Sequence, residues 1–181
     1  MTATEHDLTP GTFDKALEDY LDDRGLRYEV LDGEIVVNAS ATWDHEDAAA
    51  EILTSLRGAA PENLAVMGSQ FGFHYAPGSF LLPDVTVCLR ADRSPDGLHV
   101  APQLVVEVLS PTSARRDLGR KKEIYRDAGV PSYWVVDPEA QTLSVLSLVD
   151  GEYVETARLD GPGELTVSEP FPVTVSPWGA G

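Results

Sequence analysis

The fold is decided by residues 83–121, which read PDVTVCLRADRSPDGLHVAPQLVVEVLSPTSARRDLGRK. Between Pro83 and Arg90 apolar and polar side chains alternate, and this period of two is typical of a pleated strand. The run from Gln103 to Leu109 is nearly all apolar around Glu107, which predicts a strand buried on both faces. An ionised carboxylate is costly in such a strand unless a cation or a metal ion lies beside it, so Glu107 is the first candidate for chemistry.

Asp84 is the second candidate, because the two predicted strands can pair as an antiparallel hairpin. Opposing Asp84 with Glu107 places the centre of the connection within Ser94–Gly97, the strongest turn signal in this region. Directly opposed residues have Cβ atoms ~4.5–5.5 Å apart, which is close enough for two carboxylates to share a divalent cation. This register therefore predicts that the two carboxylates meet.

A basic helix is predicted to follow from about Ala114. Lys121 lies on a stripe of residues at helical spacing, whereas Lys122 falls off that stripe, so only Lys121 is expected to face the sheet. The segment Gly129–Pro131 ends the helix, and Ser132–Val136 returns as a strand, which predicts a crossover to a parallel neighbour. The inward stripe consists of Asp117, Lys121, Ile124, Tyr125 and Ala128.

Together these motifs resemble a large bacterial family known as putative restriction endonucleases, whose core is similar to that of the PD-(D/E)XK nucleases. The resemblance runs from roughly Tyr28 to Leu148. It is carried by the segments Pro83-Asp84, Glu107–Pro111, Asp117–Lys121 and Gly129–Asp137. The usual lysine of the wider superfamily stands two residues after the glutamate, where this chain has Leu109. In the family that this chain resembles, the lysine has moved to the next helix, which fits Lys121.

The resemblance implies a site and a reaction. Asp84 and Glu107 would be the metal-binding carboxylates and Lys121 the catalytic lysine. The backbone carbonyl of Val108 would complete a set of ligands that suits Mg²⁺ or Mn²⁺. The expected reaction is hydrolysis of DNA phosphodiester bonds by a metal-activated water. The resemblance also implies a homodimer, since cutting both strands of a duplex needs two sites.

Further candidates each have an ordinary structural alternative. Glu34 could lie near the metal ion or could simply follow a hairpin turn, and His45 could contact substrate or merely open a helix. Asp117 could orient Lys121 or only favour the helix start. The cations of the basic helix could bind phosphates or form a solvated face; they are Arg115, Arg116, Arg120 and Lys122. His74 and His99 show no metal-ligand spacing, so no zinc site is expected.

The three main candidates could form only a buried ion triad. Because buried ion pairs stabilise a fold less well than apolar packing does, their convergence from three elements favours a functional site.

The net charge of −17 is unusual for a protein that binds nucleic acid. Two other function classes therefore stay open: a catalytically idle DNA-binding or interaction module, and a metal-dependent hydrolase of a small phosphorylated substrate.

The length predicts one domain over residues 1–181, which the resemblance implies is a nuclease domain. It has a loose tail over 1–8 and a Pro/Gly-rich C-terminal extension over 161–181 that runs over the surface after one short strand. The order of helices and strands predicts a mixed α+β fold class, and the resemblance implies a restriction-endonuclease-like mixed sheet flanked by helices, with additional hairpins. The single Cys88 cannot form an internal disulfide, and no apolar run is long enough to span a membrane, so a cytoplasmic location is expected.

The other expected elements are a helix over Thr12–Arg24, a hairpin around Asp32-Gly33, a helix to Arg57 capped by Thr42 or Asp44, strands over Leu64–Met67 and Phe71–Tyr75, a hairpin around Asp150-Gly151 and a strand over Glu164–Val167.

Overall fold

The computed structural model of the chain describes residues 20–21 and 23–179. The predicted tail over residues 1–8 and most of the helix predicted over Thr12–Arg24 lie outside the described residues. Tyr20, Leu21 and Asp23 are helical, and Gly25 follows with a φ of 61°. A glycine in this left-handed conformation is a common helix end, as expected here.

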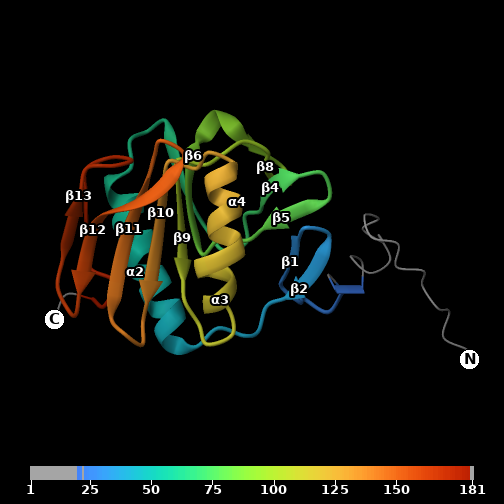
Figure 1. Ribbon diagram of the computed structural model, residues 1–181, viewed down its shortest axis with the longest axis horizontal. Coiled ribbons are helices and arrows are strands. Elements are labelled where there is room, and N and C mark those ends of the chain that lie inside the picture. The colour runs from blue at the N-terminus through green and yellow to red at the C-terminus, as the bar shows by residue number, and fades with distance from the viewer. Residues whose placement is uncertain (1–19, 22, 180–181) are drawn as a thin grey trace, which may run out of the picture.

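Two six-stranded sheets form the body of the protein (Figure 1). The central sheet has the order β12-β11-β10-β9-β6-β3, and the second sheet has the order β2-β1-β5-β4-β8-β7. The strands of the central sheet are β3 (Leu64–Gly68), β6 (Val85–Leu89), β9 (Leu104–Val108), β10 (Ser132–Asp137), β11 (Thr142–Val149) and β12 (Glu152–Asp160). The strands of the second sheet are β1 (Tyr28–Leu31), β2 (Glu34–Val37), β4 (Phe73–Ala76), β5 (Ser79–Leu81), β7 (Arg93–Ser94) and β8 (Gly97–Leu98).

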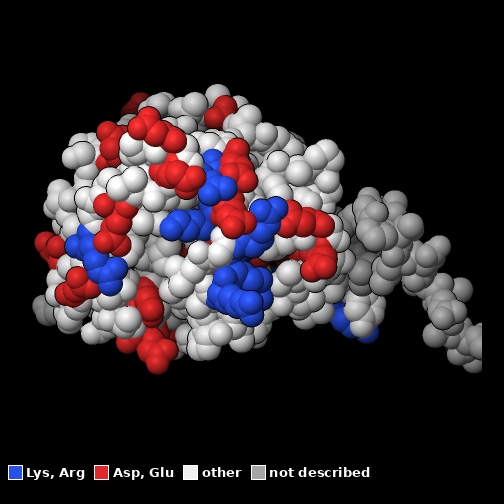
Figure 2. Space-filling view, viewed as in Figure 1, with Lys and Arg blue, Asp and Glu red and all other residues white. Residues whose placement is uncertain are grey.

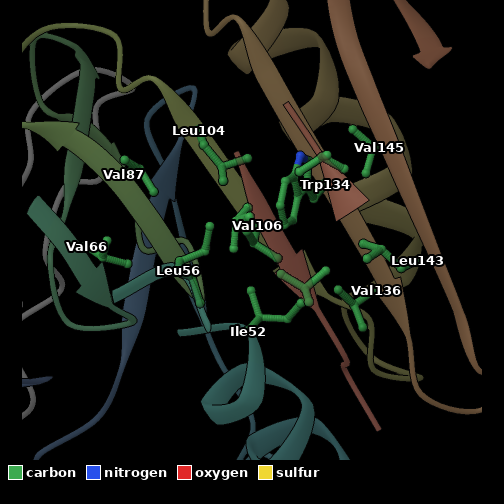
Figure 3. Packing of buried hydrophobic residues seen from close by; sticks show 14 of the residues in the cluster. Ile52, Leu56, Val66, Val87, Leu104, Val106, Trp134, Val136, Leu143 and Val145 are labelled. Carbon is green, nitrogen blue, oxygen red and sulfur yellow. The ribbon is translucent and has the colours of Figure 1, made fainter. Parts of the chain in front are cut away.

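Helices cover both faces of the central sheet (Figure 1). On one face lies α2 (Trp43–Ala59), whose Ile52 and Leu56 pack on the sheet beside Val106 and Trp134 (Figure 3). The other face is covered by a continuous helical segment made of α3 (Ala114–Arg116), the π-helical η2 (Asp117–Lys121) and α4 (Lys122–Asp127). None of the described helices combines the length and the apolar character that crossing a bilayer requires.

The strand β9 is buried along its whole length because both of its faces are covered. Its even-numbered residues Leu104, Val106 and Val108 belong to the core beneath α2, whereas Val105 belongs to the core beneath α4. Glu107 lies on the α4 side as well, where its carboxylate meets side chains of η2 and α4. Because successive side chains of a strand point to opposite faces, the single carboxylate of β9 lies on the face covered by the helix that carries Lys121.

The predicted register between the first two strands is confirmed. Val85 pairs with Val106 and Val87 with Leu104 in an antiparallel ladder, which sets Asp84 opposite Glu107. The same register continues at the predicted turn, where Ser94 pairs with Gly97. The segment from Asp84 to Glu107, called the ribbon below, differs from a simple hairpin in one feature. It passes through the 3₁₀ turn η1 (Arg90–Asp92), and its tip, formed by β7 and β8, joins the second sheet.

The other local predictions are largely confirmed. β9 and β10 are parallel and are joined through the basic helix. Thr42 is the N-cap of α2, since its side chain accepts a hydrogen bond from the backbone N–H of His45. Hairpins form at both Asp-Gly turns, where Asp32 and Asp150 have φ values of 51° and 50°. The expected mixed α+β fold class is correct.

The prediction that the C-terminal extension runs over the surface is wrong. β13 (Leu165–Val167) pairs with β14 (Val173–Val175) in a small sheet that packs against α2. Phe171 and Val175 are 4% and 0% exposed and belong to the main core. The short strand β5 was also missed, because its three residues lack a clear alternation.

Candidate active site

A cleft of about 240 Å³ opens between the start of α2, the adjoining ends of β6 and β9, and the beginning of the basic helix. Asp84, Glu107 and Lys121 all line it. The structure therefore brings together the three side chains that the sequence singled out. His45 and Asp117 line the same cleft.

Glu107 is held by two donors on one of its oxygens. Its Oε1 accepts hydrogen bonds from Lys121 Nζ at 3.0 Å and from the hydroxyl of Tyr125 at 2.6 Å. Burial raises the pKa of Glu107 well above its usual value, and the positive charge of Lys121 opposes this rise only in part. No described residue hydrogen-bonds to the other oxygen, Oε2, which leaves it available to a ligand.

Lys121 lies among three carboxylates although it is only 4% exposed. Its Nζ is 2.9 Å from Oε1 of Glu29, 3.0 Å from Oε1 of Glu107 and 3.3 Å from Oδ1 of Asp117. Burial alone would lower the pKa of this lysine, but the three negative charges raise it above its ordinary value. Lys121 therefore stays protonated at neutral pH and can act as a fixed cation, not as a general base.

Asp84 is oriented by the neighbouring strand and by α2. Its Oδ2 accepts a hydrogen bond from the backbone N–H of Val108 at 2.8 Å and lies 3.3 Å from Nε2 of His45. Burial lowers the pKa of His45, but the hydrogen bond to Asp84 and the charge of Asp84 outweigh it and raise the pKa. Since Thr42 caps the helix at His45, the first turn of α2 positions the imidazole against the carboxylate.

Glu29 is a member of the cluster that the sequence interpretation missed. It lies on β1, is fully buried, and its Oε1 accepts the backbone N–H of Leu82 at 2.8 Å. The residue chosen from this hairpin, Glu34, is exposed on β2 and does not line the cleft. The signal was present: Glu29 is a lone carboxylate in a buried strand, the same pattern that identified Glu107.

The cluster carries more negative than positive charge. Four buried carboxylates, those of Glu29, Asp84, Glu107 and Asp117, surround Lys121 and His45. Oε2 of Glu29 has no hydrogen-bond partner in the part of the chain that the structure describes, and Asp117 is held mainly by its ion pair with Lys121. Burial raises the pKa of Asp117, partly offset by Lys121. An all-oxygen donor set with unsatisfied negative charge fits a hard divalent cation such as Mg²⁺ or Mn²⁺.

The four predicted phosphate-binding cations are not equivalent. Arg116 lines the cleft, but Arg115, Arg120 and Lys122 do not. Arg120 is engaged by Asp32, with N···O distances of 2.6 and 2.7 Å. Figure 2 shows Lys and Arg side chains gathered over the basic helix, with Asp and Glu side chains close around them. The basic surface is therefore confined to the region over the basic helix and is bordered by acidic side chains.

The fold also joins two histidines that sequence spacing gave no reason to connect. His74 of β4 and His99, which follows β8, lie together with Asp96, with ligand atoms within 4.8 Å of one another. Their proximity depends on the pairing of β4 with β8, which brings distant segments side by side. These residues lie outside the lining of the cleft described above.

Comparison with known proteins agrees with the motifs. A family model, Uma2, described as "Putative restriction endonuclease", matches residues 13–177. The chain belongs to the Uma2 family. The matched range contains every residue of the carboxylate and lysine cluster, and the resemblance expected from the sequence is confirmed.

The Uma2 chain is also similar to a solved structure. The crystal structure of a putative nuclease belonging to DUF820 from Anabaena variabilis ATCC 29413 superimposes with a TM-score of 0.62 at 20% sequence identity. The similarity covers 79% of this chain and 81% of the other. At this identity the likeness shows a shared fold. A search of curated proteins finds no match.

Proposed function

We propose that this Uma2 protein is a metal-dependent endonuclease that hydrolyses DNA phosphodiester bonds. The observation that carries the proposal is the convergence of Asp84, Glu107 and Lys121 on one cleft, from two paired strands and the following helix. The site would be of the PD-(D/E)XK type, with its lysine supplied by η2 in place of β9.

The carboxylates would hold the ion through their unengaged oxygens. Asp84 and Glu107 each have one oxygen committed to protein donors, while no described residue donates to Oδ1 of Asp84 or Oε2 of Glu107. The carbonyl of Val108, a residue that lines the cleft, would be the third ligand. A bound Mg²⁺ or Mn²⁺ would lower the pKa of a coordinated water and offset charge on the phosphate.

The protein residues would act by positioning and by fixed charge. The protonated Lys121 would orient the attacking water or stabilise negative charge that develops on the phosphoryl group, and a water-poor setting strengthens either effect. Glu29 and Asp117 would hold the ammonium group in place and keep it charged. His45 would keep Asp84 in its orientation.

Two arginines of the cleft would bind the backbone of the substrate. Arg27 and Arg116 both line the cleft, and each has a buried Nε without a hydrogen-bond partner among the described residues. Nη2 of Arg27 donates to the carbonyl of Ser69, but the free Nε–H groups of both arginines remain as donors for a phosphodiester. We extend the proposal to a cytoplasmic homodimer that cuts both strands of a duplex.

The proposal is tested with two substitutions and a matched control. Glu107→Gln and Lys121→Ala are each expected to lower cleavage of plasmid DNA in Mg²⁺ or Mn²⁺ by at least ~10²-fold, as loss of a comparable electrostatic group does. The exposed Glu123→Gln makes the same chemical change on the outer side of the helix and should leave cleavage unchanged. Circular dichroism checks that each variant is folded.

Unchanged cleavage in both cleft variants would remove the assignment. A panel of small phosphorylated substrates run beside the plasmid separates a nuclease from a hydrolase of small molecules, which the acidic surface would suit. DNA binding without cleavage and without dependence on metal would instead identify an idle binding module.

A further inference from the structure

A second group of candidate metal ligands lies at the tip of the β7–β8 hairpin. His74 comes from β4, Asp96 from the turn between β7 and β8, and His99 from the residue after β8. One ligand atom of each residue lies within 4.8 Å of those of the other two. We propose that these three side chains bind a divalent transition-metal ion such as Zn²⁺, at a site separate from the cleft.

The donor set differs in kind from that of the cleft. Two imidazoles and one carboxylate suit Zn²⁺, Co²⁺ or Ni²⁺, whereas the oxygen donors around Glu107 suit Mg²⁺ or Mn²⁺. Three protein ligands leave at least one position for water on the exposed side. The two sites should therefore select different ions from the same solution.

One pair of ligand atoms already has the spacing of a metal site, whereas the two imidazole rings would have to turn toward a common point to bind one ion. Nε2 of His99 lies 3.2 Å from each carboxylate oxygen of Asp96. Ligand atoms of a tetrahedral site with bonds of ~2.1 Å stand ~3.4 Å apart, so this pair already has the required spacing. The ring of His74 is stacked on that of His99, with centroids 4.7 Å apart and planes inclined by 15°.

The ligands are held in place by neighbouring groups. Nε2 of His74 is 2.9 Å from the carbonyl oxygen of Asp96, and its ring packs against Phe80 with centroids 5.5 Å apart. If Nε2 keeps this hydrogen bond to the carbonyl, Nδ1 of His74 would be the nitrogen that binds the ion, an arrangement common in metal-binding histidines. The hydroxyl of Ser94 donates to Oδ1 of Asp96 at 2.6 Å and steadies the carboxylate.

The hairpin itself is fixed against β4. The backbone N–H of Leu98 donates to the carbonyl of Gly72 at 2.8 Å, and the Leu98 side chain is fully buried. Gly97 has a φ of 136°, and a Cβ there would come within 2.4 Å of that same carbonyl oxygen, so only glycine allows this close approach. Since β7 is the edge strand of the second sheet, a bound ion would tie this edge to β4.

The test is isothermal titration of chelator-treated protein with ZnCl₂ in excess Mg²⁺, which occupies hard oxygen sites. Wild type should bind one equivalent, and His74→Ala, His99→Ala and Asp96→Asn should each weaken binding at least ~10-fold, the loss typical when a metal site is disturbed. His6→Ala, at the one histidine outside the described residues, and Asp84→Ala in the cleft serve as controls and should bind like wild type.

Two further readouts separate this site from the proposed nuclease. Zn²⁺ should raise the midpoint of thermal unfolding of wild type but not of His99→Ala, and Co²⁺ should give a visible absorption band that the same variant lacks. His99→Ala should retain Mg²⁺-dependent cleavage. Zinc affinity that is absent in wild type, or equal in wild type and His99→Ala, overturns the proposal whatever the nuclease assay shows.

Discussion

The contacts of Lys121 define what this residue can do. Its ammonium group lies within 3.3 Å of three carboxylates and is almost completely buried. Neutralising the lysine would leave those carboxylates without their main counter-charge, at a cost that grows in a low dielectric. The same cluster carries excess negative charge, so its stability without a metal ion should depend on pH.

We predict that the metal-free protein loses stability as pH rises above about 4, the range in which the unfolded carboxylates release their protons. The pKa values of Glu107 and Asp117 are raised by burial, so the folded state holds protons that the unfolded chain releases at about pH 4. Their stabilising contribution is complete below that pH and is lost as pH rises through the folded pKa. Lys121 also has a raised pKa, but its contribution is lost only above about pH 10.4 and is constant here.

The measurement is urea unfolding at several pH values in the presence of a chelator. Glu107→Gln removes one of the groups with a raised pKa, so this variant should lose less stability than wild type over the same rise in pH. Glu123→Gln, at an exposed position, should follow wild type. Parallel pH profiles for wild type and Glu107→Gln would contradict the expectation.

At the residue scale, the sequence predicted those candidate residues that a local pattern marks, such as a charge within an apolar strand or a position fixed by strand register. Glu107 was found as a charge within an apolar strand, and Asp84 was found through the register of its partner. Glu29 obeyed the same rule, but its strand is only four residues long and its partner, Lys121, is distant in sequence. Which carboxylate of a hairpin turns inward depends on the packing of the second sheet, which local pattern does not contain.

The basic helix is the element that brings Lys121 to the two carboxylates at β6 and β9, Asp84 and Glu107. Its inward stripe was predicted from helical spacing, and both Asp117 and Lys121 are buried as expected. The π-helical turn over Asp117–Lys121 was not foreseen. Such turns are rare and often occur at functional sites, which agrees with its position on the cleft wall.

The C-terminal hairpin gives a prediction at the scale of elements. Phe171→Ala should lower the free energy of unfolding by about 3–5 kcal/mol, because the ring is buried in the main core and its removal leaves a cavity. Ser168→Ala, an exposed change in the same connection, should cost less than about 0.5 kcal/mol. Chemical denaturation of both variants measures the difference. Equal free energies of unfolding would contradict the burial of Phe171 in the core.

Elements with local signals were predictable, and those that depend on distant partners were not. The Asp-Gly turns at residues 32–33 and 150–151 need a left-handed backbone that these residues readily adopt, so both hairpins were identified. β5 and β14 are three residues each and exist only because other strands lie beside them. Their Pro- and Gly-rich surroundings suggested loops.

At the scale of the whole molecule, the charge of −17 and the local basic surface would limit the binding of the proposed DNA substrate. In the basic helix, Arg120 and Arg126 already pair with neighbouring carboxylates. Arg115, Arg116 and Lys122 have no ion-pair partner among the described residues, which leaves few cations for phosphates. Binding should therefore be weak in the absence of metal, since the overall charge repels the duplex.

We predict a shallow salt dependence for DNA binding. With about three or four phosphates neutralised per protomer, the slope of log K against log salt concentration should be about −3 to −4. Fluorescence anisotropy with a labelled duplex and the Glu107→Gln variant measures it without cleavage. A slope steeper than about −6 would reveal a larger cationic surface than the described residues present.

The ribbon that runs from Asp84 to Glu107 keeps one register on both sides of its bend. Its two arms between the paired segments, residues 88–92 and 99–103, are equally long. A residue gained or lost in one arm would slide Asp84 away from its partner carboxylate, while a matched change in the other arm would restore the alignment. Natural variation in the length of this ribbon should therefore occur in compensating pairs, one change in each arm.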